Sequence, residues 1–312
     1  VSPFVAPAVA VVSSLAWGGF LALVVALLAL DLGVFHRKAH VVTTREALGW
    51  SVVWVSLGLL FGCGVWVFMG SERALEYFAA YVVEKSLSVD NVFVFAIIFS
   101  SLSIPRLYQH RVLFWGILTA LVLRGVMIVG GTALLERFHA LVYVFGGFLV
   151  LTGLKLLFRK GDHDPAASLA FRAIRRLVPT SPALDGDRFF TRVEGRCLAT
   201  PLLAALLLVE VTDVIFALDS IPAVLAISRE PFVVFTSNVF AILGLRSLYF
   251  LLSGALTKLP GLDVGLAAVL MFVGVKLAAV EVVKIPTALS FAVIVALLTT
   301  SVLVARARAR RK

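Results

Sequence analysis

The stretch EKSLSVDNVFVFAII, residues 84–98, returns in changed form as VEVTDVIFALDSIPAV, residues 209–224. Each copy carries two acids six residues apart within an apolar run: Glu84 and Asp90 in the first, Asp213 and Asp219 in the second. Ionisable side chains within hydrocarbon are costly and usually mark ion pathways. A duplicated pair of such acids therefore predicts a membrane transporter built from repeats.

The similarity between the copies continues through the next two apolar runs. In the first copy these runs contain LTALVLRG, which ends with Arg124 and Gly125, and FLVLTGLKL, which contains Lys155. In the second copy they contain FAILGLRS around Arg246 and LMFVGVKL around Lys276. Each copy thus has three apolar runs, with acids in the first, an Arg in the second and a Lys in the third.

The composition excludes a soluble domain, because 61% hydrophobic residues are more than one core can bury. About 20 apolar residues cross a bilayer as a helix. The apolar runs therefore predict an all-α membrane protein with about nine transmembrane helices. These predicted spans are residues 8–30, 47–69, 76–101, 111–134, 138–158, 198–227, 232–256, 262–282 and 286–305.

The basic residues predict the orientation of these spans. Most of the 28 Lys and Arg residues lie in alternate loops, which the positive-inside rule assigns to the cytoplasm. The N-terminus is then outside and the C-terminus inside. The two copies begin an odd number of spans apart, so they form two inverted three-helix repeats. The net charge of +10 follows from this topology and gives no reason to expect a nucleic-acid partner.

The same analysis divides the chain into five parts. Residues 1–75 hold two N-terminal transmembrane helices, and residues 76–158 hold the first three-helix repeat. Residues 159–197 form a basic cytoplasmic loop, with room for a short amphipathic helix around 166–177. Residues 198–282 hold the second, inverted repeat, and residues 283–312 hold the last transmembrane helix and a basic cytoplasmic tail.

Ten charged residues lie inside the spans, five acids and five bases. An unpaired charge costs about 2.5–3.5 kcal/mol at the centre of a membrane helix, so most of them must be paired, protonated or hydrated. Arg124 and Arg246 lie too deep to reach the membrane surface easily, and we expect them to be counter-ions or gates. Lys85 can reach outward, whereas Lys155 and Lys276 lie close to span ends. The five acids are Glu84, Asp90, Glu210, Asp213 and Asp219.

The acids, with the oxygens of Asn91 and Ser220, predict a site for a hard divalent cation such as Mn²⁺, Mg²⁺ or Ca²⁺. On continuous helices, Asp90 and Asp219 point away from their partner acids. Convergence requires a site shared between helices, or unwinding at residues 86–88 or at Pro222. A divalent cation adds two charges to this set, so release of protons by Glu84 and Glu210 would permit metal/proton antiport.

Three motifs resemble those of the TerC family of integral membrane proteins, which is related to the lysine-exporter superfamily. They are ALDLGVFHRKAH with REAL in residues 29–48, EKSLSVDNVFVFAIIF in 84–99, and EVTDVIFALDSIPAVLAI in 210–227. The resemblance, which includes the manganese-exporting branch, implies a multi-pass protein of the bacterial plasma (inner) membrane, with links to tellurite resistance and metal efflux. The acidic-motif positions of the family carry over to Asp90, Asn91, Asp213, Asp219 and Ser220.

We therefore expect an exporter of a divalent cation, with Mn²⁺ as the transported substrate, and neither an enzyme nor a carrier of a prosthetic group. Its expected partners are the lipid bilayer and the metal ion, and protein partners remain open. No nucleotide-binding loop is present, so another ion or the membrane potential must drive uphill transport.

Other classes of protein are alternatives. The first is a membrane partner that loads metal onto secreted proteins or joins a tellurite or stress-resistance complex, without transport of its own. An exporter of basic amino acids rests on superfamily analogy alone. An intramembrane aspartyl protease could use two buried Asp residues, but it needs a Gly-x-Gly-Asp-like element within a span, and the nearest match, PGLDVG, lies at a span edge.

Overall fold

The computed structural model describes residues 14–35, 42–138, 140–158, 181, 184–193, 196–253, 262–279 and 285–309. The chain divides into two units, Val1–His40 and Val41–Lys312. Helix α1 (Ser14–Phe35) is the described part of the first unit. The second unit holds the other described helices and both strands.

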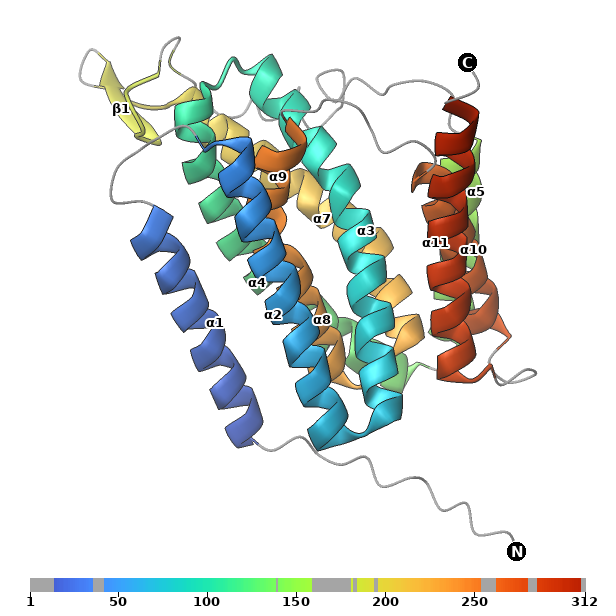
Figure 1. Cartoon of the computed structure of the whole chain (residues 1–312). Coiled ribbons are helices and arrows are strands. Elements are labelled where there is room, and N and C mark those ends of the chain that lie inside the picture. Colours follow the sequence, from blue (N-terminus) through green and yellow to red (C-terminus); the bar gives the residue numbers. More distant parts are fainter. Residues whose placement is uncertain are drawn as a thin grey trace, which may run out of the picture. The chain divides into compact units, whose positions relative to one another are not determined.

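The second unit consists mainly of long helices, drawn in Figure 1. They are α2 (Thr44–Met69), α3 (Ser71–Ser101), α4 (Arg106–Arg137), α5 (Leu141–Leu157), α7 (Pro201–Ile227), α8 (Pro231–Leu243), α9 (Leu245–Ser253), α10 (Leu262–Ala278) and α11 (Thr287–Ala309). Strands β1 (Phe190–Val193) and β2 (Arg196–Ala199) pair antiparallel before α7.

Six stretches of the described chain are long and apolar enough to cross a membrane: α1, α2, α4, α7, α8 together with α9, and α11. Helices α5 and α10 are also apolar but have 17 residues each. Helix α3 has 31 residues and carries several charged side chains among its apolar ones. Each predicted span therefore corresponds to one helix, except 232–256, which contains the two short helices α8 and α9.

The segment predicted as a plain loop, residues 159–197, departs from the expectation. It contains β1 and the first half of β2, and in this hairpin Phe190 pairs with Ala199 and Val193 with Arg196. The next helix begins at Pro201 because Thr200 is extended and a proline fits the first helical position. The chain is thus not purely helical, and the amphipathic helix predicted around 166–177 lies outside the described residues.

The acid-bearing helices α3 and α7 are continuous, so unwinding at residues 86–88 or at Pro222, one of the two routes to convergence, does not occur. The hydroxyls of Ser86 and Ser88 donate to the carbonyls of Val82 and Glu84, at 2.7 and 2.8 Å, within the same helix. Helix α7 continues past Pro222 to Ile227. The interruption occurs instead at Gly244, between α8 and α9.

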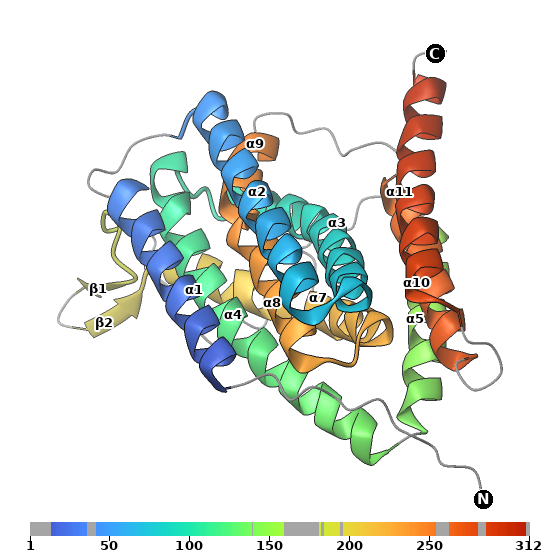
Figure 2. The same cartoon turned by 60° about the horizontal axis from the view of Figure 1, so that its bottom comes forward.

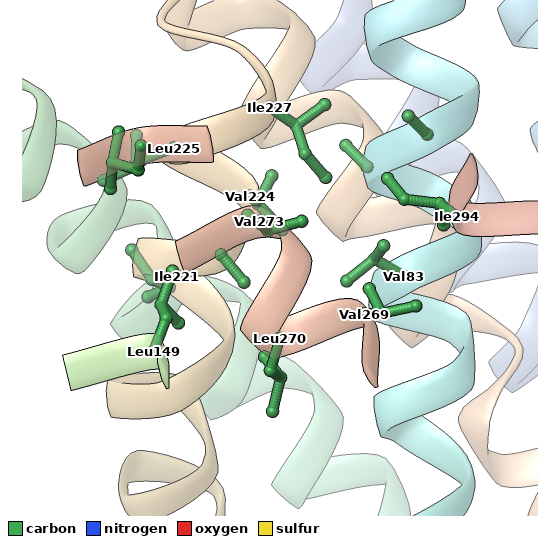
Figure 3. Packing of buried hydrophobic residues seen from close by; sticks show 14 of the residues in the cluster. Val83, Leu149, Ile221, Val224, Leu225, Ile227, Val269, Leu270, Val273 and Ile294 are labelled. Carbon is green, nitrogen blue, oxygen red and sulfur yellow. The ribbon is translucent and has the colours of Figure 1, made fainter. Parts of the chain in front are cut away.

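A shared apolar core holds helices of both sequence copies together. Helix α3 packs on α2, α7 and α8, while α4 packs on α7 and α5 packs on α10. Figures 1 and 2 show α5, α10 and α11 side by side. In the close view of Figure 3, Val83 of α3 and Ile221 and Val224 of α7 lie near Leu149 of α5 and Val273 of α10. The leading and third helices of both copies therefore contribute to one core.

Glycines bring the backbones of α5 and α10 into close contact. A Cβ added at Gly146 would lie 2.8 Å from the carbonyl oxygen of Gly274, and one at Gly153 would lie 2.7 Å from that of Ala267. Membrane helices often associate through such small residues, because close backbone approach replaces the missing hydrophobic driving force. We call Gly146, Gly153, Ala267 and Gly274 the glycine seam.

Candidate functional site

Arg124 joins the two acid-bearing helices from its place on α4. Its Nη1 contacts Oε1 of Glu84 on α3. Its Nη2 and Nε donate to the two carboxylate oxygens of Asp213 on α7, at 3.0 and 3.3 Å. Nη1 also donates to the hydroxyl of Ser220, at 3.2 Å. One guanidinium therefore bridges an acid from each sequence copy.

This central cluster, Glu84, Arg124, Asp213 and Ser220, is deeply buried. Arg124 and Glu84 are each 1% exposed and Asp213 is 6% exposed. Burial of charges is costly, and the two-pronged contact of an arginine with a carboxylate is one of the strongest ways to offset that cost. Oε2 of Glu84 is buried and has no hydrogen-bond partner among the described residues.

The structure brings only part of the predicted metal site into this cluster. Asp213 and Ser220 belong to it, and Asn91 is buried one residue after Asp90 on α3. The backbones of Asp90 and Asp219 lie within continuous helices, but their side chains are outside the description. Within the described part of the chain, no group of three His, Cys, Asp or Glu side chains is arranged to hold a metal.

Arg246, the counterpart of Arg124 in the second copy, lies just after the interruption at Gly244. It is buried on α9, close enough to His110 near the start of α4 for their charges to interact. The neighbouring Tyr249 donates to the side-chain oxygen of Gln109, at 2.9 Å, which also connects α9 to the start of α4. Arg246 thus occupies a different level of α4 from Arg124.

Glu210 stands one helical turn before Asp213 on α7. Both of its carboxylate oxygens are buried without a hydrogen bond of ordinary geometry among the described residues, and the Thr119 side chain of α4 is near enough to interact with them. A Cβ added at Gly116 of α4 would lie 3.8 Å from Oε1 of Glu210, so this carboxylate faces α4. An unpaired buried carboxylate is costly, which makes Glu210 unusual among the described acids.

The sequence suggested that Lys85 could reach outward, but its side chain points toward α8 instead. Its Nζ donates to the carbonyl oxygen of Ala241, at 3.1 Å, in the last turn of α8. A cation near a helix C-terminus is favourable, because the last carbonyl groups have no partner within the helix. Lys85 therefore stabilises the end of α8 next to the interruption at Gly244.

A polar cluster near the start of α3 was not expected from the sequence. Oε2 of Glu76 accepts hydrogen bonds from Nη1 of Arg73, at 2.7 Å, and from the Ser228 hydroxyl, at 2.6 Å. Nearby, burial raises the pKa of the Glu230 carboxyl, and the charge of Arg73 partly opposes this shift. The sequence feature that could have indicated this cluster is Glu76, an acid about two turns before Glu84 at the edge of a predicted span.

A second residue that the sequence reasoning missed is Asn238, which lies in the polar stretch TSN within apolar α8.

The central cluster presents carboxylate and hydroxyl oxygens around one positive charge. Two carboxylates and one guanidinium leave an excess of one negative charge among these described groups. Oxygen ligands of this kind suit hard divalent cations. These oxygens could therefore bind a cation if the guanidinium of Arg124 moved out of the space between the two carboxylates.

Long apolar helices with charges paired in their interior define a multi-pass integral membrane protein. The chain belongs to the Integral membrane protein TerC family, whose family model matches residues 69–312.

The chain is 58% identical over 295 residues to "Uncharacterized membrane protein STKORF319" of Myxococcus xanthus, covering 94% of this chain and 92% of that protein. It is 43% identical over 300 residues to "Putative membrane-bound redox modulator Alx" of Salmonella typhi, covering 93% of each. The protein of that name in Escherichia coli K12 is 42% identical, covering 93% of this chain and 94% of that protein. No solved structure matches the chain.

Proposed function

We propose that this TerC-family protein exports a divalent metal cation, with manganese as its substrate, across the bacterial plasma (inner) membrane. The observation that carries the proposal is the buried bridge of Arg124 between Glu84 and Asp213. Buried ionisable groups on membrane helices commonly belong to ion pathways, and these groups come from both sequence copies.

The chemistry of the central cluster supports a hard cation. Carboxylate oxygens of Glu84 and Asp213 and the hydroxyl of Ser220 are ligands that Mn²⁺ and Mg²⁺ accept, and Asp90, Asn91 and Asp219 would add further oxygens. The guanidinium of Arg124 lies between the two carboxylates. In the proposed cycle, the metal takes the place of this guanidinium, so the two carboxylates face a positive charge both with and without bound metal.

The glycine seam supports two inverted repeats, and the basic residues of alternate loops support an N-terminus outside and a C-terminus inside. Gly153 and Gly274 hold the same place in the two copies, in TGLKL and VGVKL, and Gly146 and Ala267 precede them by about two turns. Gly146 contacts Gly274, and Gly153 contacts Ala267. Each contact becomes the other when the copies are exchanged, as a two-fold relation requires. Transport would then proceed by one repeat moving against the other.

Protons are the proposed driving ion, in metal/proton antiport. Arrival of a divalent cation adds two positive charges to a buried set of groups, and release of protons compensates for them at the least cost. Glu210 suits this role because its buried carboxylate lies one turn from Asp213 without a hydrogen bond of ordinary geometry among the described residues. No catalytic reaction and no prosthetic group form part of the proposal.

Flux measurements on the purified protein test the proposal. Reconstituted alone in proteoliposomes that contain a metal-sensitive dye, the protein is expected to carry Mn²⁺. Asp90→Asn and Asp213→Asn should each lower the flux by roughly tenfold or more, since each removes one ligand charge and keeps the shape. Glu72→Gln, which changes an exposed acid on α3, is the matched control and should transport normally. Wild-type flux in both Asp variants would refute the assigned site.

The alternative is a membrane partner that hands metal to secreted proteins, or a member of a stress complex, without transport of its own. The same proteoliposomes separate the two functions, because the alternative predicts metal binding without flux by the protein alone. The name of the Alx relatives suggests a redox role. Here the two cysteines are free and lie far apart in the chain, Cys63 on α2 and Cys197 on β2, so the observations favour transport.

A further inference from the structure

Asn238 of α8 is buried without the hydrogen bonds that a buried amide normally makes. It is 1% exposed, and neither Oδ1 nor Nδ2 has a partner among the described residues. Leaving such a group buried and unsatisfied is costly, so each case calls for an explanation. The two preceding residues show the usual solution: Thr236 donates to the carbonyl of Phe232 at 2.7 Å, and Ser237 to that of Val234 at 3.0 Å.

The neighbours of Asn238 along α8 indicate where its amide points. One turn before it, the Phe235 ring would lie 3.1 Å from a Cβ added at Gly125 of α4. One turn after it, the carbonyl of Ala241 accepts from Lys85 of α3. At about 100° per residue, position 238 lies on the helix surface between its neighbours at 235 and 241. Asn238 therefore faces the junction of α8 with α3 and α4.

The same contacts set its level within the membrane. Gly125 directly follows Arg124, and Lys85 directly follows Glu84. These contacts place Asn238 near the layer in which Arg124 contacts Glu84. Oε2 of Glu84, in that layer, is also buried without a partner among the described residues.

We infer that Asn238 is a further ligand of the cation site, supplying a neutral amide oxygen from the second helix of the second copy. This inference rests on the proposed function and deepens it. Hard divalent cations bind six or more oxygens, and amide carbonyls are regular members of such sites. A neutral ligand completes the coordination shell without adding to the negative charge that must be neutralised when the metal leaves.

Binding of Mn²⁺ to the purified protein in detergent tests the inference, with MnCl₂ as the probe and equilibrium dialysis as the measurement. Asn238→Leu keeps the size of the side chain and removes its oxygen. It should weaken Mn²⁺ binding about tenfold, equivalent to ~1.4 kcal/mol. Without metal, the Leu variant should unfold at the wild-type temperature or above it, because no satisfied hydrogen bond is lost.

Two further variants complete the test. Asn238→Asp restores an oxygen ligand and should bind Mn²⁺ at least as tightly as wild type. Ser237→Ala removes a neighbouring buried polar group that bonds only its own helix, and it should leave Mn²⁺ binding unchanged. Wild-type affinity in Asn238→Leu, or equal weakening in the Leu and Asp variants, overturns the role of Asn238 and leaves the proposed function standing. Absence of Mn²⁺ binding by the wild-type protein contradicts both.

Discussion

Helix α4 and the pair α8–α9 occupy the same place in the two sequence copies, yet the first is continuous and the second is divided just before its arginine. Helix α4 runs unbroken for 32 residues and presents Arg124 to acids from both copies. Its counterpart stops at Gly244, and Arg246 follows on α9, near His110. Arg246 lies near the start of α4, whereas Arg124 lies in the middle of that helix. Similar sequences have thus formed one continuous helix, which carries Arg124 in its middle, and one helix that is divided at Gly244.

The third helices show the opposite behaviour. Helices α5 and α10 meet through the glycine seam, in which Gly146 contacts Gly274 and Gly153 contacts Ala267. Backbone contacts of this kind leave little freedom, because no flexible side chain can adjust. The two copies therefore keep equivalent contacts in this interface and differ where side chains carry charge. The α5–α10 interface is thus the conserved part of the repeat, and the charged residues of the second helices are the part that differs.

The strongest test of the comparison removes each arginine in turn. Arg124→Ala leaves Glu84 and Asp213 buried without their partner, and we expect it to destabilise the protein by about 3–5 kcal/mol and to abolish transport. Unfolding in detergent micelles measures the loss. Arg246 is also buried, on α9, so Arg246→Ala is the direct comparison, and equal losses would show that the two arginines are energetically equivalent. Arg111→Ala, which breaks an exposed pair with Asp187, is the control and should cost about 0–1 kcal/mol.

A combined variant shows whether the loss comes from unpaired charge. Adding Glu84→Gln and Asp213→Asn to Arg124→Ala removes the buried charges together with their partner. Stability should then return toward the wild-type value, whereas transport should remain absent. A triple variant as unstable as Arg124→Ala alone would mean that the arginine stabilises the helices through packing and not through its charge.

Alanine substitutions in the glycine seam test the symmetric half of the comparison. Gly153→Ala and Gly274→Ala each place a Cβ 2.7 Å from a backbone oxygen, and each should destabilise the protein by about 1–3 kcal/mol. Gly147→Ala is the matched control on α5, because nothing lies within 4 Å of its added Cβ. The control should be neutral or slightly stabilising, since alanine favours helices. Clearly unequal losses at 153 and 274, which hold the same place in the two copies, would break the two-fold relation.

The smallest expected change in stability comes from Glu210, a second point of difference between the copies. The aligned position in the first copy is Tyr81, so only the second copy carries an acid there. Glu210→Gln removes a carboxylate that makes no hydrogen bond of ordinary geometry among the described residues, and it should leave unfolding nearly unchanged. Under metal/proton antiport, a pH gradient should drive Mn²⁺ uptake into wild-type proteoliposomes but not into those holding the variant. Mn²⁺ flux that ignores a pH gradient in the wild type would refute the antiport.

Much of the architecture could be predicted from the sequence, for a physical reason. A membrane imposes the length and polarity of its spanning helices, so apolar runs mark the helices almost one for one. The limits of α2 and α7 lie within three residues of the predicted spans 47–69 and 198–227. The duplicated order of acids, Arg and Lys identified the helices that carry buried charge, and the cost of such charge required that most of it be paired.

Only the tertiary structure decided which charges meet. Arg124 bonds Glu84, 40 residues away, and Asp213, 89 residues away, because α3, α4 and α7 pack together. The interruption at Gly244 and the buried amide of Asn238 also depend on neighbours from distant parts of the chain. Hydropathy depends on each residue and its sequence neighbours, whereas pairing depends on the rotation and depth of each helix against the others. The positions of the helices could therefore be predicted from the sequence, whereas the residues that meet in the candidate site could be identified only from the tertiary structure.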